Sequence, residues 1–430
     1  MTTEKTAPAY HRSVLVCLAL SLIGATDMLA AERITIEVRE TAGIRRFSHP
    51  VAVALELPEA SSEQASVCLL EQGKPHVAQF RVDGTDDDRS RWWLDFQTSL
   101  APFESKSFTV EYGPGVPTGP EQDAGHQLTI LDDAFRVANG PYISWLIPRD
   151  LDGLLRSVNY GQVEHMHPES PGLVLLDRDG AAHPLGSVPD ERGLDNSIVG
   201  RVVREGPLAV ALRFEATQRN PELRGVRSVI DIHLPVSRSW VEVDWQVIDP
   251  EVKVSSLQAE LQLDLDAPTS SAPTLVDFGA TTMVYTALRA GQQAELRGTG
   301  KTDDGTDASE LESGWQVLHG PAGRLGSLVD SAKDGARDAE GWAHVMDRKW
   351  CLAMAVDKFA RRTDDRIHLS AEGTVLLGRS FGAHPAATRD RDQKRFRFWL
   401  HFVNFPPQHG AATSPQSMQN PLEVRVVSGQ

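Results

Sequence analysis

Residues 341–403 read GWAHVMDRKWCLAMAVDKFARRTDDRIHLSAEGTVLLGRSFGAHPAATRDRDQKRFRFWLHFV, and this stretch decides the fold. It predicts three apolar strands, over Trp350–Val356, Ile367–Leu377 and Phe396–Phe402. A loop crowded with arginine, aspartate and histidine, Arg379–Arg395, lies between the last two. Because a sheet fixes the geometry of the loops that join its strands, we expect this loop to form one wall of any binding groove.

The composition is that of a folded, acidic protein. The 430 residues are 40% hydrophobic and 24% charged, and the net charge is −16, from 43 basic and 59 acidic side chains. This length exceeds that of one ordinary core and predicts two domains or three. A protein that binds a nucleic-acid backbone needs a basic face, so the charge argues against DNA or RNA as a partner.

Residues 1–31 have the pattern of a secretory signal peptide. A polar start precedes the apolar run Val14–Ile23, which is too short to span a bilayer, and small residues follow. We predict a cleaved signal, with a retained anchor as the alternative, and a secreted or periplasmic protein with no stable membrane span after cleavage. An oxidising location permits a disulfide, but Cys68 and Cys351 both lie in apolar runs, which favours buried free thiols.

The rest of the chain alternates apolar and polar residues between turns rich in Gly, Pro and Asp. This pattern predicts an all-β protein. Short, evenly spaced runs over residues 32–113 predict a small N-terminal β-sandwich, and the Gly- and Pro-rich residues 114–126 predict a linker. Longer runs over residues 127–430 predict one large twisted β-domain, in which Val329–Ala339 is the helical candidate.

A resemblance to a known fold family rests on segments of the larger domain. ILDDAFRVANG (residues 130–140) and DGLLRSV (residues 152–158) resemble the opening strands of galactose-mutarotase-like β-supersandwich domains. Trp342–Phe359 is similar to the last sheet of bacterial exo-rhamnogalacturonan-lyase-like proteins, which also carry a small N-terminal sandwich. The resemblance implies a β-supersandwich and polysaccharide lyase activity. Such lyases are usually larger than this chain.

A lyase of this kind would cleave a uronate-containing glycan by β-elimination. The reaction needs a base for the C5 proton and a cation beside the carboxylate. Tyr160, His165 and His167 are candidate catalytic residues, because they cluster within nine residues. In an extended segment His165 and His167 share one face and could reach one ligand. Two solvated loop histidines are the alternative interpretation, since no spacing signature defines the cluster.

The arginine-rich loop supplies the second group of candidates. Arg379, Arg389 and Arg391 could bind a substrate carboxylate through their guanidinium groups. His384 is a further candidate catalytic residue, because the proline after it favours an extended backbone. The interleaved aspartates could instead pair with these arginines on a solvated surface.

Two adjacent tryptophans offer a platform for a sugar ring. Trp92 and Trp93 lie in one predicted strand, so their side chains point to opposite faces and at least one belongs to the core. We retain Trp92 as a candidate substrate-binding residue.

The leading hypothesis is an exported carbohydrate-active protein, a polysaccharide lyase whose partner is a polysaccharide or oligosaccharide. One alternative is a non-catalytic glycan-binding or structural β-sandwich protein, because a fold alone does not establish catalysis. Another is an aldose-epimerase-like enzyme that pairs His165 or His167 with Glu242 or Asp244. The cofactor is left open. Calcium is conceivable, but no acidic run has the spacing of a calcium loop.

Overall fold

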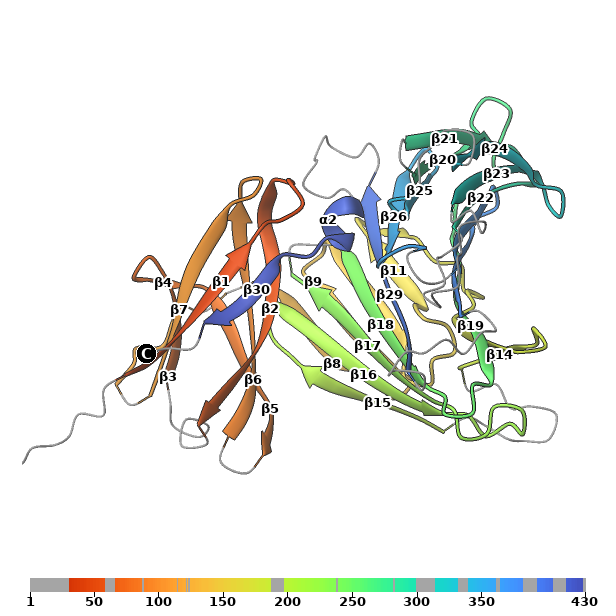
Figure 1. Ribbon diagram of the computed structural model, residues 1–430. Helices are drawn as coiled ribbons and strands as arrows, with labels where there is room; N and C mark the ends of the chain where they lie inside the picture. The colour runs from red at the N-terminus through yellow and green to blue at the C-terminus, as the bar shows by residue number, and fades with distance from the viewer. Residues whose placement is uncertain are drawn as a thin grey trace, which may run out of the picture.

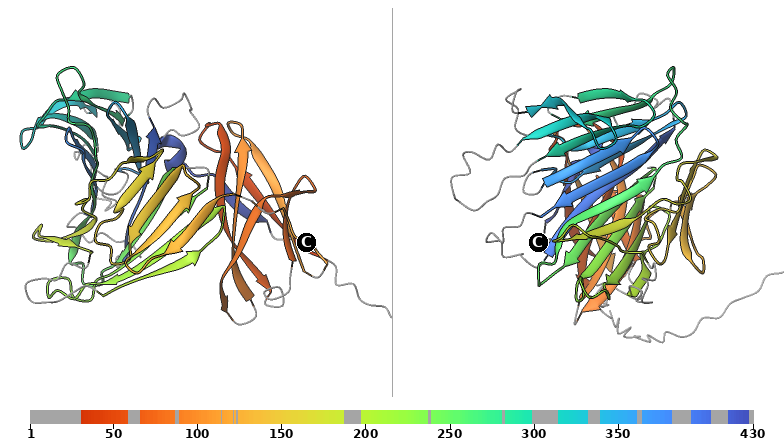
Figure 2. Two further views of the ribbon diagram at one scale, coloured as in Figure 1. Left: turned by 180° about the vertical axis from the view of Figure 1, so that it is seen from behind. Right: turned by 90° about the vertical axis from the view of Figure 1, so that its right-hand side faces the viewer.

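Two β-domains lie side by side, and the chain is all-β as predicted (Figures 1 and 2). The smaller domain contains the first seven strands and the last one, and the larger domain contains the others. The computed structural model describes residues 31–58, 66–86, 89–113, 115–120, 122, 124–186, 197–236, 239–280, 283–298, 314–331, 339–360, 364–381, 393–404 and 415–427.

The smaller domain is a sandwich of a five-stranded sheet, in the order β30-β1-β7-β3-β4, and a three-stranded sheet, in the order β2-β6-β5. Alternate side chains of each strand, such as Ile36, Leu94 and Phe108, pack between the sheets. The strands are β1 (Glu32–Arg39), β2 (Arg46–Pro58), β3 (Ser66–Glu71), β4 (Lys74–His76), β5 (Ala78–Asp86), β6 (Arg89–Leu100), β7 (Ser105–Gly113) and β30 (Glu423–Val427).

β30 departs from the predicted domain division, because it comes from residues 127–430 and yet completes the smaller domain. It pairs antiparallel with β1, from Thr35 opposite Val427 to Arg39 opposite Glu423. The other edge of β1 is taken by β7. β30 therefore satisfies a row of backbone groups that β1 would otherwise leave open.

The larger domain contains three antiparallel sheets. A five-stranded sheet has the order β12-β11-β10-β9-β8, an eight-stranded sheet the order β14-β13-β19-β28-β27-β22-β23-β24, and a nine-stranded sheet the order β15-β16-β17-β18-β29-β26-β25-β20-β21. Their strands are β8 (His126–Ile130), β9 (Ala134–Asn139), β10 (Ile143–Pro148), β11 (Ser157–Tyr160), β12 (Val163–Glu164), β13 (Leu173–Asp177), β14 (Ala182–Pro184), β15 (Ser197–Arg204), β16 (Ala209–Thr217), β17 (Arg227–Pro235), β18 (Trp240–Ile248), β19 (Val254–Gln262), β20 (Thr274–Gly279), β21 (Met283–Leu288), β22 (Gln292–Gly298), β23 (Trp315–Pro321), β24 (Gly326–Asp330), β25 (Trp342–Met346), β26 (Trp350–Val356), β27 (Asp364–Ser370), β28 (Thr374–Ser380) and β29 (Gln393–Asn404).

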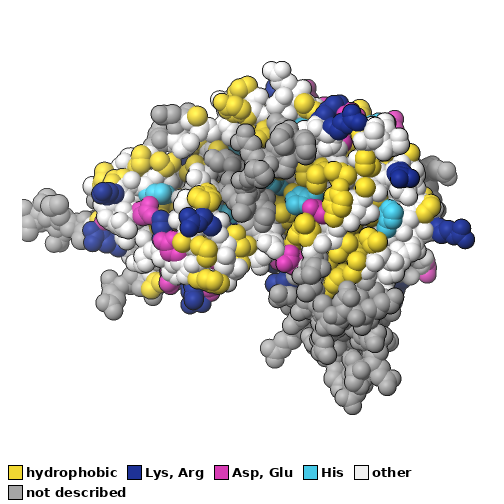
Figure 3. Space-filling view, turned by 90° about the horizontal axis from the view of Figure 1, so that it is seen from above, with side chains coloured by type: hydrophobic (Ala, Val, Ile, Leu, Met, Phe, Trp, Pro, Cys, Tyr) yellow, Lys and Arg dark blue, Asp and Glu magenta, His cyan; other side chains and the backbone are white. Residues whose placement is uncertain are grey.

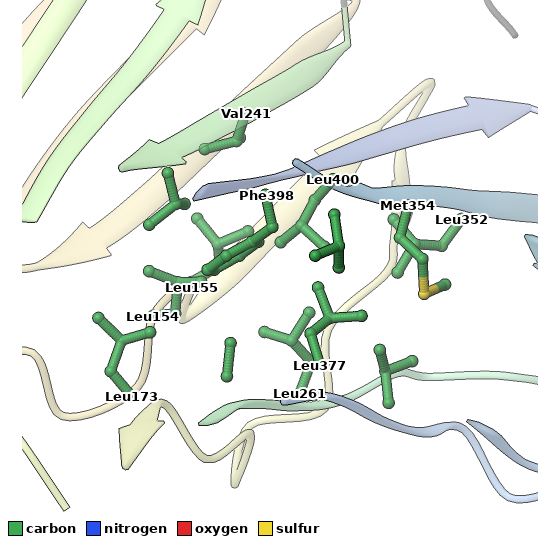
Figure 4. Packing of buried hydrophobic residues seen from close by; sticks show 14 of the residues in the cluster. Leu154, Leu155, Leu173, Val241, Leu261, Leu352, Met354, Leu377, Phe398 and Leu400 are labelled. Atoms are coloured by element: carbon green, nitrogen blue, oxygen red, sulfur yellow. The ribbon is translucent and has the colours of Figure 1, made fainter. Parts of the chain in front are cut away.

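One apolar core joins these three sheets. Figure 4 shows Val241, Phe398 and Leu400 of the nine-stranded sheet facing Leu261 and Leu377 of the eight-stranded sheet. In β18 the even-numbered positions after Trp240 are partly exposed and the odd-numbered ones are buried, so the nine-stranded sheet has an inner, apolar face and an outer, polar face. The outer face is the one that meets the smaller domain.

The stretch that opened the sequence analysis contains more strands than predicted. Trp350–Val356 is β26 and Phe396–Phe402 lies within β29, as predicted. The third run, Ile367–Leu377, is a hairpin of β27 and β28 with its turn near Gly373. All seven residues of β26 are buried, because the helix α2 (Pro415–Gln419) packs Met418 against its outer face.

Two further sequence predictions are settled by the described residues. The predicted helix over Val329–Ala339 is wrong at its first two residues, because Val329 and Asp330 belong to the strand β24 (Gly326–Asp330), which pairs with β23. Cys68 and Cys351 are both buried and free, as favoured. Residues 1–30 of the predicted signal lie outside the described residues, and within the described ones no helix is long and apolar enough to cross a membrane.

Polar side chains of the smaller domain fix its position on the larger one. The Gln79 side chain accepts a hydrogen bond from the Leu208 backbone N–H (2.9 Å) and donates to the Ala209 carbonyl (3.1 Å). The buried Arg46 guanidinium donates to the carbonyls of Ser417 and Asn420, both at 2.6 Å. Buried polar groups of this kind need their partners, so they define one relative placement of the domains.

Candidate functional site

The predicted histidine cluster is divided between core and surface. His165 is fully buried, and its ring lies 4.1 Å from that of Trp350, measured between centroids. His167 is exposed and accepts a hydrogen bond from the Glu169 backbone N–H. Tyr160 is half-buried against the main core. The structure brings the rings of Tyr160 and His165 to 6.2 Å between centroids, whereas His167 is exposed, so the three side chains do not meet at one site.

The predicted arginine clamp has one described member. Arg379 is buried, and its guanidinium donates to both carboxylate oxygens of Asp365, at 2.9 and 2.8 Å. It also donates to the carbonyls of Asp357 and Arg395. Its donors are thus engaged within the protein. His384, Arg389 and Arg391 lie outside the described residues.

Trp92 belongs to the core of the smaller domain, whereas its neighbour Trp93 faces the larger domain. The alternation of β6 explains this difference: Trp92, Leu94 and Phe96 point into the sandwich, and Trp93 and Asp95 point out of it. Trp93 and Asp95 open into a pocket that sequence reasoning did not identify.

This interdomain pocket is enclosed by three parts of the chain and has a volume of about 280 Å³. Residues of β2 and β6 line one side, residues on the outer face of the nine-stranded sheet line the second, and the segment around α2 lines the third. Seen from above, histidine and acidic side chains stand among hydrophobic ones on the surface of the larger domain (Figure 3). The polar and aromatic side chains of the lining are His49, Trp93, Asp95, Phe96, Arg204, His233, Trp240, Glu242, Arg397, Trp399 and Ser417.

An ion pair between the domains forms the deep end of the pocket. Arg204 Nη1 lies 2.6 Å from Asp95 Oδ1, and both side chains are nearly inaccessible to solvent. The same guanidinium stacks on Trp93, with Cζ 4.4 Å from the ring centroid. Burial raises the pKa of Asp95, and Arg204 opposes that rise.

His233 stands beside this pair and stays neutral. Its Nε2 is 3.9 Å from Asp95 Oδ1. Burial, and then the nearby positive charges of Arg204 and Arg397, lower the pKa of His233 well below its ordinary value. At neutral pH the imidazole is therefore unprotonated, and the same surroundings disfavour its imidazolium form.

A second ion pair forms the wall on β18 and β29. Arg397 donates to Glu242 Oε1 at 2.9 Å and stacks on Trp399, whose indole N–H donates to Glu242 Oε2 at 3.0 Å. Glu242 lies on the outer face of the sheet, while His165 packs against Phe402 of the inner core. The structure therefore separates His165 from Glu242, which the epimerase hypothesis would pair.

Three buried polar atoms around the pocket have no hydrogen-bond partner among the described residues. They are Asp95 Oδ2, His233 Nε2 and the indole N–H of Trp93. Buried polar groups in folded proteins are nearly always paired, so these three atoms are positions that bound water or a polar ligand would satisfy. Sequence reasoning considered Trp93 as part of a sugar platform but missed Asp95 and His233, because these two lie far apart in the chain, on strands whose polar alternation looks like an ordinary solvated face.

Comparisons with known proteins relate the chain to solved structures only. No family model matches the sequence, and no curated protein matches it significantly. A protein in glycosyl hydrolase family 38 from Enterococcus faecalis has a TM-score of 0.52 at 11% identity, covering 92% of this chain and 47% of that one. An alpha-mannosidase from Enterococcus faecalis V583 has a TM-score of 0.51 at 10% identity, covering 92% and 46%.

This chain thus spans about half the length of both structures, and at such identity the likeness is one of fold. A galactose mutarotase related enzyme from Lactobacillus acidophilus aligns with 67% of this chain and 99% of its own at 12% identity, but its TM-score of 0.32 is too low to carry an argument. Within the described residues, no three His, Cys, Asp or Glu side chains are grouped as metal ligands.

Proposed function

We propose that this chain is a carbohydrate-active protein that binds a uronate unit of a glycan in the interdomain pocket and cleaves the glycan by β-elimination. The observation that carries the proposal is the set of three unpaired buried atoms, Asp95 Oδ2, His233 Nε2 and Trp93 Nε1, around one cavity. A volume of about 280 Å³ lies just under the usual range for ligand pockets, which suits a single sugar ring.

The lining combines the groups that a sugar needs. The partly exposed indole ring of Trp93 borders the cavity and offers an apolar surface to the C–H side of a sugar ring, and charged groups offer hydrogen bonds to its hydroxyls. The alpha-mannosidase that shares the fold acts, by its name, on a carbohydrate, which supports this class of ligand.

The charged groups meet the two requirements of β-elimination. Arg397 is the more exposed of the two arginines and would share its guanidinium between Glu242 and the substrate carboxylate, which acidifies the proton on C5. His233, whose Nε2 has no partner among the described residues, would take that proton as the base. As the C5–H and C4–O bonds break, a C4=C5 double bond forms. The departing oxygen would receive the proton from the His233 imidazolium formed in that step, because the surroundings that lower the pKa of His233 favour release of the proton.

The test is a lyase assay with rhamnogalacturonan, homogalacturonan, alginate and glycosaminoglycans, read as the ultraviolet absorbance of the unsaturated product. We expect a rise with one polymer, and His233→Gln should lower kcat by at least about a hundredfold, the usual contribution of a general base. His344→Gln is the matched control, because His344 also pairs with a carboxylate, Asp277, but lines none of the described hollows.

Three outcomes would count against the proposal in different ways. Full activity in a folded His233→Gln variant would remove the assigned base. Binding of a polymer without any absorbance rise would leave a non-catalytic glycan-binding protein. The absence of both binding and turnover would refute the carbohydrate assignment itself.

A further inference from the structure

A second hollow lies on the other side of α2 from the interdomain pocket. Its volume is about 730 Å³, and it shares Arg397 and Pro421 with that pocket. Ser417 and Met418 of the α2 segment face the interdomain pocket, whereas Gln416 and Gln419 face this second space. We call it the outer hollow. Its polar lining comprises Thr41, Glu340, Asp357, Lys358, Arg395, Arg397, Gln416, Gln419 and Asn420.

Lys358 is the cation in this lining that has no protein partner. It is exposed, and among the described residues its ammonium group makes no ion pair or hydrogen bond. Its backbone lies in the left-handed region, with φ of 50°, and Ala360 in the same turn has φ of 51°. Non-glycine residues hold this conformation only where the surroundings impose it, and such strain is concentrated at functional sites.

The buried pair Arg379–Asp365 imposes that conformation. Asp365 Oδ2 accepts a hydrogen bond from the Ala360 backbone N–H (2.8 Å), and Arg379 Nη2 donates to the Asp357 carbonyl (2.6 Å). Arg379 Nη1 also donates to the Arg395 carbonyl (3.3 Å). One buried ion pair thus positions both the turn that carries Lys358 and the strand that carries Arg395.

Three other charged side chains of the outer hollow already have partners within the protein. Arg395 is paired with Asp244, and Arg397 with Glu242. Glu340 accepts hydrogen bonds from the Trp342 indole N–H and the Gln416 amide. The hydrogen bond to Asp244 raises the pKa of the Arg395 guanidinium, and the nearby negative charge of Asp357 adds to this rise. Lys358 is left to bind a charge from outside, and Gln419 Oε1 is a buried acceptor without a partner among the described residues.

We infer that the outer hollow is a second subsite, which binds the carboxylate of a neighbouring acidic sugar through Lys358. This inference rests on the proposed function and names its substrate class as a polyuronate of at least two units. Arg397 lies in both linings, so adjacent acidic units would flank one guanidinium. The amides of Gln416, Gln419 and Asn420 offer donors and acceptors to the ring hydroxyls.

The test is calorimetric binding of D-galacturonate and its di- and trisaccharides to the full chain. We expect the trisaccharide to bind at least about tenfold more tightly than the monosaccharide, because the second unit adds a charge-assisted contact. Lys358→Gln should remove about tenfold of trisaccharide affinity and leave monosaccharide affinity unchanged, while Lys358→Arg should retain most of it. Lys74→Gln is the control, since Lys74 is an exposed lysine far from both hollows.

The outcomes separate this inference from the proposed function. Monosaccharide binding with no gain for the longer sugars, or a trisaccharide affinity that Lys358→Gln leaves unchanged, would overturn the second subsite and leave the first in place. No binding of any of the three sugars would overturn the polyuronate assignment of both.

Discussion

Replacing Arg46 by methionine should cost about 3 kcal/mol of unfolding free energy. Arg46 and Glu40 form an ion pair (3.2 Å) in which both side chains are buried, and Arg46 also supplies the hydrogen bonds to Ser417 and Asn420. Removing one member of a buried pair typically costs about 3–5 kcal/mol, since a charge is left without its partner. Glu40 keeps backbone N–H donors from Ala42, Gly43 and Phe103, which places the loss at the lower end.

Urea unfolding, followed by both tryptophan fluorescence and far-ultraviolet circular dichroism, measures this loss. Two probes are needed because two domains need not unfold together. Arg33→Met is the control: Arg33 pairs with Glu111 but is 68% exposed, so its loss should stay below about 1 kcal/mol. A loss for Arg46→Met no larger than that of the control would refute the argument that this buried arginine holds the domains together.

Burial raises the pKa of Glu40, but hydrogen bonds from Phe103, Ala42, Arg46 and Gly43 outweigh it and lower the pKa overall. The stability that this carboxylate contributes is therefore fully present above the pKa of Glu40 in the unfolded chain, and it is lost as the pH falls through the lower pKa of the folded protein. In urea titrations at several pH values, the unfolding free energy of a Glu40→Gln variant should fall less steeply with acid than that of the unaltered protein. Burial lowers the pKa of His126 to about 4, so as the pH falls the unfolded chain binds a proton at this residue before the folded chain does. The unfolding free energy should therefore fall by about 3 kcal/mol between pH 7 and pH 4, and the His126→Phe variant should lose less over that range. Burial also raises the pKa of the Cys68 and Cys351 thiols, so both should resist a disulfide reagent at pH 8 and react once urea unfolds the chain.

The strands were predictable from the sequence because each carries its own alternation. β18 and β26 needed no information from the rest of the chain, apart from the α2 contact that buries both faces of β26. The interdomain pocket was not predictable in this way, since Asp95 and His233 meet only after two domains dock. Arg379 shows the intermediate case. The sequence identified Arg379 as a candidate at the end of a predicted strand. Its structural role, however, is decided by its buried partner Asp365, which lies in the neighbouring strand β27.

The pairing of β30 with β1 has a consequence for the timing of synthesis. Ribosomes add roughly 5–20 residues per second, so roughly 20–80 seconds separate the emergence of β1 from that of β30. During this interval the nascent smaller domain carries an unpaired edge strand, which is the part of a sheet most prone to join another chain. A bulky fusion placed directly behind residue 427 would hinder this last pairing and should lower the yield of native protein, whereas a spacer of flexible residues should restore it.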